Sequence, residues 1–293
     1  MGYLGGMVEA GRGLHTTLSA ALPSLSRPLY ECILTGVPPV ASGITHNGVS
    51  RLSQHDAIFH LARAAGKRTA AAAYYWVSEL YNQSPWLAAR DRYTHDEQLP
   101  IQHGCFYWDD AYPDSHLLMD GEWLRSQYDP DFLLIHPMGV DDAGHKFGLD
   151  SRQYRNQARR MDSLLADLLP QWLAEGYQVV ITSDHGMNND LSHGGTLPEE
   201  RTVPLWLFGD AFIERWPDGV VIAQTQLCAL MADLLGVPHD KPSGPPLLKA
   251  TFMRVLFLMI RRPPRSSRIN PWQPGAGHTV TGCRPWCCCP LSS

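Results

Sequence analysis

The stretch YQVVITSDHGM, residues 177–187, decides the fold. Its apolar, largely β-branched run is typical of a buried strand, and polar side chains follow the run at once. The stretch DFLLIHP, residues 131–137, has the same form, and Asp141 follows it much as Asp184 follows the first strand. Because ligands of an open α/β sheet bind beyond the carboxyl ends of its strands, we expect Asp141 and Asp184 to lie at one site.

Further strand patterns alternate with helical patterns along the chain. Strands are predicted at residues 68–77 and 202–209, and helices at residues 53–66, 114–128 and 150–176. Ser53 is the predicted N-cap of the first of these helices, and Pro170 is expected to bend the last one. The alternation predicts an α/β fold with a mostly parallel central sheet and helices on both of its faces.

The composition narrows the class of protein. The chain has 293 residues and a formal net charge of −5, so it offers no basic surface for nucleic acid. No apolar run reaches the roughly 18 residues that a membrane-spanning helix requires, so no membrane segment is predicted. The scattered residues Cys32, Cys105 and Cys228 do not suggest a disulfide framework, and no secretory signal is recognised. These features predict a cytoplasmic globular protein.

The two ends of the chain differ from its body. Residues 251–293 contain six Arg but no Lys, Asp or Glu, and they show neither helical nor strand periodicity. We interpret them as a non-native or disordered tail, because LFLMIRRPPRSSR resembles translated adapter sequence; a basic interaction tail is the alternative. The folded domain is therefore predicted over residues 1–250. Its first predicted element is a helix, which suggests that a first strand of the sheet has been lost.

Acidic and histidine side chains gather in three short segments. Asp141 and His145 lie in GVDDAGHKFG, Asp184 and His185 lie in TSDHGM, and His193 lies in LSHGG. Such mixed oxygen and nitrogen donors suit Zn²⁺ or a similar divalent metal. Five donors exceed the needs of one catalytic zinc, which keeps a coordination position open. They suggest two metals that clamp a phosphoryl group.

Each of these residues taken alone also has an ordinary structural interpretation. An aspartate that follows a strand often caps the next helix, and a single histidine in a loop is usually a surface residue. The metal-site hypothesis therefore depends on the three segments together, all of which we place on loops at strand ends.

The motifs resemble those of the alkaline phosphatase superfamily, in its nucleotide pyrophosphatase/phosphodiesterase branch. That branch has an Asp-x-x-x-His with Gly before the His, a SDHGM element and a later His–Gly pair. Here these correspond to residues 141–145, 183–187 and 193–194. Upstream, PSLSRPLYECILTGVPPVASGITHN resembles the nucleophile segment, including its TG-x-x-P element. The resemblance covers roughly residues 1–250 and implies an alkaline-phosphatase-like fold.

The resemblance also implies two zinc ions with separate ligand sets. One set comprises Asp141, His145 and His193, and the other comprises Asp184, His185 and the Ser26 oxygen. Alignment on ILTG puts Ser26 at the nucleophile position, with Ser24 as the rival. It puts Asn47 at the position of an asparagine that contacts a phosphoryl oxygen. Attack by Ser26 would form a phosphoseryl intermediate, which water then hydrolyses.

Three positions depart from the family pattern. The family has one more metal-binding aspartate, at the end of its first strand, and no residue here fills that role. Arg27 follows the nucleophile where nucleotide-cleaving members often have an aromatic residue. It either binds a substrate phosphate or carboxylate, or faces solvent. Ser42 stands where the family usually has a histidine.

We therefore predict a two-metal hydrolase of phosphodiester or pyrophosphate bonds, with a small-molecule phosphate ester as substrate. The alternatives are a phosphomonoesterase or phosphonate hydrolase of the same superfamily, and a truncated fragment that is inactive or only binds a ligand. A sulfatase is disfavoured because SLSRPLYE has Tyr30 where the sulfatase motif needs an arginine. The sequence predicts no oligomeric state.

Overall fold

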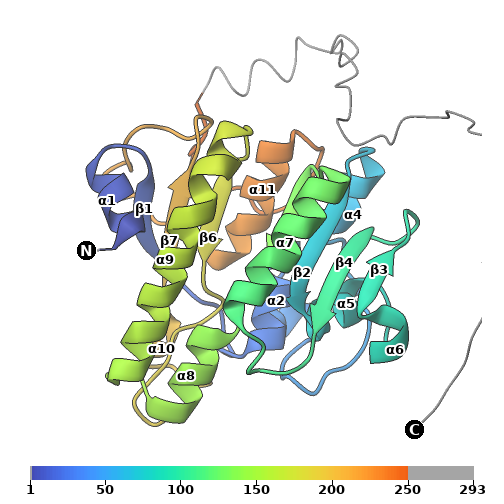
Figure 1. Cartoon of the computed structure of the whole chain (residues 1–293), viewed down its shortest axis with the longest axis horizontal. Helices are drawn as coiled ribbons and strands as arrows, with labels where there is room; N and C mark the ends of the chain where they lie inside the picture. Colours follow the sequence, from blue (N-terminus) through green and yellow to red (C-terminus); the bar gives the residue numbers. More distant parts are fainter. Residues whose placement is uncertain (1, 250–293) are drawn as a thin grey trace, which may run out of the picture.

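The computed structural model describes residues 2–249 (Figure 1), so the predicted tail at 251–293 lies outside the described range. Its strands are β1 (Leu14–Ser19), β2 (Thr69–Tyr74), β3 (Tyr93–His95), β4 (His103–Tyr107), β5 (Phe132–Ile135), β6 (Val179–Thr182) and β7 (Thr202–Phe208). Its helices are α1 (Tyr3–Glu9), α2 (Ser26–Thr35), α3 (Pro39–Ser42), α4 (Ile58–Ala64), α5 (Tyr75–Tyr81), α6 (Ala88–Asp91), α7 (Asp114–Tyr128), α8 (Gly139–Phe147), α9 (Arg152–Ala174), α10 (Pro198–Arg201), η1 (Gln224–Gln226) and α11 (Leu227–Leu235).

The described strands form two sheets instead of the single sheet that we expected. Four strands pair in the order β3-β4-β2-β5, and three pair in the order β1-β7-β6. In the first sheet β2 runs parallel to β4 and β5, whereas β3 is antiparallel to β4. In the second sheet β7 is antiparallel to both of its neighbours. The α/β class is confirmed, but the pairing is mixed, because an apolar strand pattern does not encode the direction of its partner.

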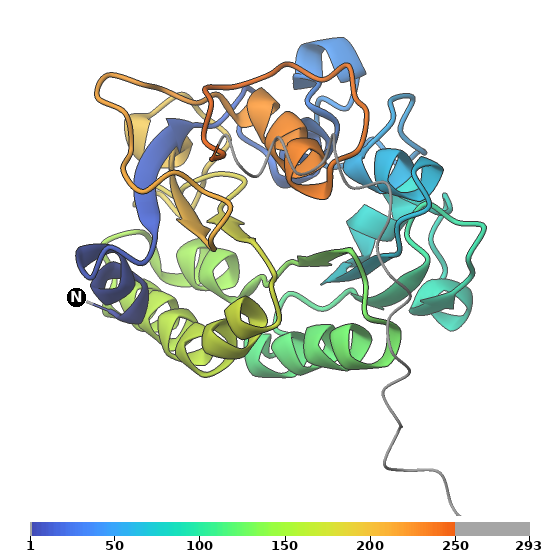
Figure 2. The same cartoon turned by 90° about the horizontal axis from the view of Figure 1, so that it is seen from above.

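Helices cover both faces of the strands (Figure 2). On one face of β2, Leu117 of α7 packs in a cluster with Ala72. On the other face, Phe59 of α4 packs in a cluster with Ala71, which also includes residues of α11. Four consecutive alanines of β2 are fully buried, and their small side chains let helices approach the sheet from both sides.

Helix α9 is the longest element and confirms the predicted helix at 150–176. Its N-cap is Ser151, whose hydroxyl accepts a hydrogen bond from the Tyr154 N–H at 3.0 Å. Its apolar side packs against β6, and Asp162 on it accepts hydrogen bonds from the first backbone N–H groups of α1. Among the described helices, none combines the length and the apolar character that crossing a membrane requires.

Three local predictions were wrong. Ser53 does not cap a helix, because α4 begins at Ile58 and the Ser53 hydroxyl donates to the Glu31 carboxylate at 2.5 Å. The strand predicted over 68–77 ends at Tyr74, where α5 begins. Asp141 lies on a helix, α8, and not on a loop at the strand end.

Candidate metal and nucleophile site

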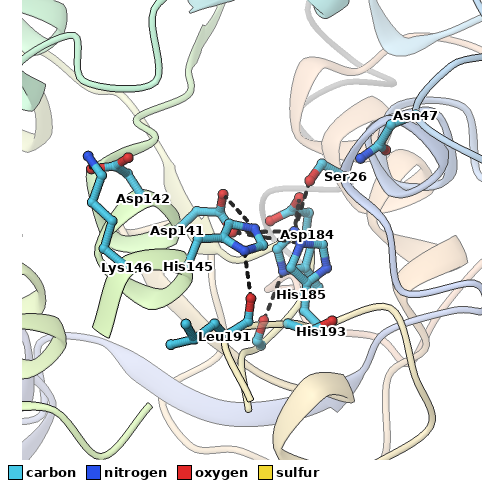
Figure 3. Close-up of polar contacts among 12 residues, drawn as sticks. Ser26, Asn47, Asp141, Asp142, His145, Lys146, Asp184, His185, Leu191 and His193 are labelled. Atoms are coloured by element: carbon cyan, nitrogen blue, oxygen red, sulfur yellow. Dashed lines mark hydrogen bonds and ion pairs between the residues drawn. The ribbon is translucent and has the colours of Figure 1, made fainter. Parts of the chain in front are cut away.

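Helix α8 carries the first two predicted ligands. Asp141 and His145 lie one helical turn apart, so both side chains project from the same face of the helix. Asp142 and Lys146 form an ion pair of 2.7 Å on a different part of α8, away from the cluster (Figure 3). Gly144 packs directly on Met187, and a Cβ there would come within 2.5 Å of the Met187 side chain. This glycine therefore lets α8 lie close to the SDHGM segment.

The SDHGM segment positions the next two ligands just beyond β6. The Ser183 hydroxyl donates to the His185 carbonyl at 2.5 Å, which fixes the turn after the strand. The N–H of Gly186 donates to the Glu200 carbonyl at 2.7 Å. A Cβ at Gly186 would lie 2.0 Å from the Glu199 carbonyl oxygen, so no larger residue fits this path without a backbone shift. His185 is buried as a result.

Three histidine side chains each direct Nδ1 at a backbone carbonyl group. The Nδ1 atoms of His145, His185 and His193 lie 2.9, 2.9 and 2.7 Å from the carbonyl oxygens of Leu191, Gly186 and Ser24. Because a carbonyl oxygen only accepts, each Nδ1 carries the proton. In the neutral imidazole each Nε2 then presents a lone pair, which is the form of histidine that ligates metals.

These lone pairs converge on the Asp141 carboxylate. The Nε2 atoms of His185 and His193 both lie 3.9 Å from Asp141 Oδ1, and that of His145 lies 3.6 Å from Oδ2. One ligand atom each from Asp141, His185 and His193 lie within 4.8 Å of one another. Asp141 Oδ1 is buried and has no hydrogen-bond partner. A buried acceptor facing imidazole lone pairs fits a cation better than any neutral arrangement.

Asp184 and Ser26 also lie beside Nε2 of His185 (Figure 3). His185 Nε2 is 3.2 Å from Asp184 Oδ2 and 3.0 Å from Ser26 Oγ. His185 thus neighbours both predicted ligand sets, and its ring stacks on that of His193 with centroids 3.5 Å apart. The division of the ligands between two metals stays a prediction.

The hydroxyl group of Ser26 contacts the histidine cluster, whereas the hydroxyl group of its rival Ser24 does not. Ser26 is the first residue of α2, so its hydroxyl lies at the positive end of that helix's dipole. Ser24 is fully buried, and its hydroxyl donates to the Glu200 carbonyl at 3.0 Å. Asn47 Oδ1 accepts the Arg27 N–H at 3.0 Å, which orients the amide group of Asn47 near Ser26 (Figure 3).

Arg27 is not solvent-facing. Its guanidinium forms a 2.6 Å ion pair with Glu79 and donates to the Val49 carbonyl at 3.2 Å. It also lies over the ring of Trp76, 4.7 Å from the centroid. The side chain is therefore held within the protein, and contact with a substrate remains a prediction.

Burial sets the protonation of the cluster. It raises the pKa of Asp141, which the neighbouring His185 only partly offsets, and it raises the pKa of Asp184. It also lowers the pKa of His185 and of His193. Neutral imidazoles are ready ligands, and a divalent cation would stabilise the ionised carboxylates that burial disfavours.

Two polar residues beside the cluster were missed by the sequence reasoning. Tyr30 Oη and His136 Nδ1 are both buried without a hydrogen-bond partner, and their rings lie edge to face with centroids 4.6 Å apart. Burial raises the pKa of Tyr30 and lowers that of His136. His136 directly follows the apolar run of β5, so its position at a strand end was the available signal.

Comparison with known proteins identifies the family of this chain. The family model described as type I phosphodiesterase / nucleotide pyrophosphatase matches residues 6–193. The catalytic subunit of human GPI ethanolamine phosphate transferase 2 is 27% identical over 258 residues, which cover 85% of this chain. GPI ethanolamine phosphate transferase 2 of Aspergillus fumigatus is 24% identical over 79% of this chain. The chain spans only 25% of the human relative's length and 32% of the fungal relative's.

Solved structures support the same fold. Human ectonucleotide pyrophosphatase/phosphodiesterase 5 superposes with a TM-score of 0.62 at 14% identity, covering 85% of this chain and 95% of that one. A putative sulfatase from Bacteroides fragilis superposes with a TM-score of 0.53 at 16% identity, covering 79% and 68%. The family match spans well over half of the chain, and this chain therefore belongs to the type I phosphodiesterase / nucleotide pyrophosphatase family of the alkaline phosphatase superfamily.

Proposed function

We propose that the chain is a metal-dependent enzyme that cleaves phosphodiester or pyrophosphate bonds of a small-molecule ester, with Ser26 as nucleophile. The observation that carries the proposal is the convergence of three imidazole lone pairs on Asp141, next to the Ser26 hydroxyl. His185 and His193 are buried, and both direct Nε2 at an Asp141 oxygen that has no hydrogen-bond partner. The arrangement is explained if divalent cations, which we propose are zinc, complete it.

We further propose that two such cations bind. The ligand atoms of Asp141, His185 and His193 lie within 4.8 Å of one another, and Asp184 and Ser26 add oxygen donors beside His185. Asp141, His145 and His193 would hold one, and Asp184, His185 and the Ser26 oxygen the other. When bound, the cations would lower the pKa of the serine hydroxyl and neutralise charge on the phosphoryl group.

The remaining steps follow from this chain's own side chains. Ser26 Oγ attacks phosphorus and loses its proton, while the bond from phosphorus to the leaving alcohol breaks and the departing oxygen takes up a proton. Asn47 accepts the Arg27 N–H through Oδ1, so its amide N–H₂ is free to donate to a non-bridging phosphoryl oxygen. A water molecule then displaces Ser26 from the phosphoseryl group and completes hydrolysis.

A second candidate is transfer to an alcohol in place of water. The relatives favour this candidate, since the human and the Aspergillus fumigatus proteins are GPI ethanolamine phosphate transferases. The chemistry at Ser26 is the same in both cases, and only the second acceptor differs. Hydrolysis of a phosphomonoester or of a phosphonate would use the same nucleophile, so p-nitrophenyl phosphate serves as a comparison substrate.

The experiment measures hydrolysis of bis-(p-nitrophenyl) phosphate by the full chain, with zinc and after treatment with EDTA. We expect EDTA to abolish activity, zinc to restore it, and Ser26→Ala to lower kcat at least about 10³-fold. Ser24→Ala is the matched control, because it removes a hydroxyl bound to the Glu200 carbonyl and keeps the carbonyl that orients His193. It should retain activity.

Adding an alcohol such as ethanolamine to the assay separates the two candidates. Formation of a phosphodiester of the added alcohol indicates transfer, and release of the monoester alone indicates hydrolysis. Equal rates for the wild type and Ser26→Ala would overturn the nucleophile assignment. Less than one bound zinc per chain, with no activity, would favour an inactive fragment over an enzyme.

A further inference from the structure

Tyr30 carries a buried hydroxyl group that has no hydrogen-bond partner among residues 2–249. Its side chain belongs to a residue that is only 4% exposed. Tyr81 and Tyr107 are similarly buried, but their hydroxyl groups donate to protein oxygens at 2.9 and 2.7 Å. An unpaired hydroxyl inside a protein costs free energy, so the stability of the fold does not explain why Tyr30 carries one.

The position of Tyr30 on α2 directs its side chain at the nucleophile. Tyr30 lies four residues after Ser26, so the two side chains share one face of the helix. Because helical side chains lean toward the N-terminus, the ring of Tyr30 extends back toward Ser26, the first residue of α2. The ring is held edge to face against His136 and tilted against Trp76, with centroids 4.6 and 6.3 Å away.

The charges of the cluster reach the hydroxyl group of Tyr30. Burial raises the pKa of Tyr30, the carboxylates of Asp184 and Asp141 add to this effect, and the Ser26 hydroxyl opposes it. Such influences weaken with distance, so they agree with a hydroxyl group that lies beside Ser26 and the two acids. A tyrosine hydroxyl already keeps its proton at neutral pH when its pKa is ordinary, so Tyr30 is a hydrogen-bond donor there.

The oxygen of Ser26 is free to accept such a bond. Ser26 Oγ lies 3.0 Å from His185 Nε2 (Figure 3). Because His185 carries its proton on Nδ1, which faces the Gly186 carbonyl, Nε2 accepts and the Ser26 hydroxyl donates. The lone pairs of Ser26 Oγ therefore remain available to a donor, and Tyr30 offers one from the next turn of the same helix.

We propose that Tyr30 is a catalytic residue whose hydroxyl group donates a hydrogen bond to Ser26 Oγ and promotes cleavage of the phosphoseryl group. This inference rests on the proposed function. In that step a water molecule attacks phosphorus, the bond from phosphorus to Ser26 Oγ breaks, and its electron pair stays on Oγ. The attacking water loses one proton, and Oγ takes one up. Tyr30 keeps its own proton and stabilises the negative charge that Oγ carries as the bond breaks.

The two half-reactions depend on Tyr30 to different extents. Negative charge leaves Ser26 Oγ when it attacks phosphorus, whereas negative charge develops on Oγ when the phosphoseryl group is cleaved. A donor at Oγ therefore favours the second step. With bis-(p-nitrophenyl) phosphate this step should limit turnover, because nitrophenolate leaves more readily than a serine alkoxide.

The test compares Tyr30→Phe, which removes only the hydroxyl group, with the matched control Tyr81→Phe, whose hydroxyl group is paired with Glu31. Steady-state rates are measured with bis-(p-nitrophenyl) phosphate on the full chain with zinc. Mass spectrometry of acid-quenched samples measures the p-nitrophenyl phosphoryl group on Ser26. For Tyr30→Phe we expect kcat to fall at least about tenfold and kcat/KM, which reports the first step, to stay within about twofold. The covalent adduct on Ser26 should accumulate.

The control should show the reverse pattern. Tyr81→Phe should keep the kcat of the wild type and lower Tm, because Glu31 loses a donor. Tyr30→Phe should melt at or above the Tm of the wild type, because it loses no hydrogen bond.

Each contrary result has a distinct meaning. A lower Tm for Tyr30→Phe would show that its hydroxyl group serves the fold, and would overturn the proposal whether or not the chain is active. An unchanged kcat, or an equal loss of kcat and kcat/KM without the adduct, would overturn the role of Tyr30 and leave the proposed function standing. Activity that survives Ser26→Ala would overturn both.

Discussion

Glu79→Ala removes the carboxylate that neutralises the buried guanidinium of Arg27. Only 3% of the Arg27 side chain and 7% of the Glu79 side chain are exposed, and their closest atoms are 2.6 Å apart. Glu79 also accepts the Trp86 N–H at 3.1 Å. Removing one partner of a buried ion pair leaves an uncompensated charge and costs about 3–5 kcal/mol. In a domain of this size each kcal/mol lowers Tm by roughly 2–4 °C, so we expect a Tm about 6–20 °C lower.

Thermal unfolding followed by circular dichroism measures this loss. Asp218→Ala is the matched control, because Asp218 pairs with Arg215 at 3.4 Å but the two side chains are 91% and 83% exposed. Its Tm should equal that of the wild type within error. The double variant Arg27→Met/Glu79→Leu should recover much of the loss, because no buried charge remains. A Glu79→Ala protein that melts like Asp218→Ala would refute the reasoning.

The same variants separate two roles of Arg27. If Arg27 only anchors the start of α2, the double variant should keep the KM of the wild type. If Arg27 binds substrate, the KM of the double variant should rise even though the stability of that variant recovers.

Three further predictions concern the core and the cluster. Burial raises the pKa of Glu31 in the folded protein. The contribution of Glu31 to stability is therefore largest below its usual pKa and is lost as pH rises through the folded pKa. The urea midpoint of Glu31→Gln, measured relative to that of the wild type, should increase between pH 4.5 and 7.5. Gly186→Ala should abolish zinc binding and destabilise the fold, because its Cβ would clash with the Glu199 carbonyl. The control is Gly6→Ala, whose Cβ would have no neighbour within 4 Å. In chemical denaturation it should stabilise α1 by about 0.5–1 kcal/mol. Zinc should raise Tm more at pH 7.5 than at pH 5, because protons compete with the metal for the carboxylate of Asp141, whose pKa burial raises; an equal rise at both values would contradict this ligand set.

The strand-end acids could be predicted because their signal is local. The apolar runs of β5 and β6 and the polar residues that follow them identify a strand and its carboxyl end without knowledge of the partners. The predicted ligands accordingly lie together with Ser26 (Figure 3). The start of α9 was predicted for the same reason, since the capping serine acts within one turn.

What failed depends on contacts between distant segments. Asp141 was expected on a loop because it follows the end of a strand, but it lies in α8, whose Gly144 packs closely on Met187 of a distant segment. The spacing of Asp141 and His145, one helical turn, was a usable signal. Ser53 was expected to cap a helix, but its hydroxyl donates a hydrogen bond to Glu31, which is distant in sequence. The pairing of β7 and the division into two sheets also depend on partners that no local pattern reveals.

The carbonyl groups that hold the three imidazoles have a consequence for how the site tolerates mutation. The oxygens of Ser24, Gly186 and Leu191 belong to the backbone, so they are present whatever side chain occupies those positions. Only the path of the chain must persist for each histidine to keep its tautomer. Sequence drift at Ser24 should therefore leave the geometry of the predicted ligands intact, and a search for co-varying side chains would overlook the groups that orient them.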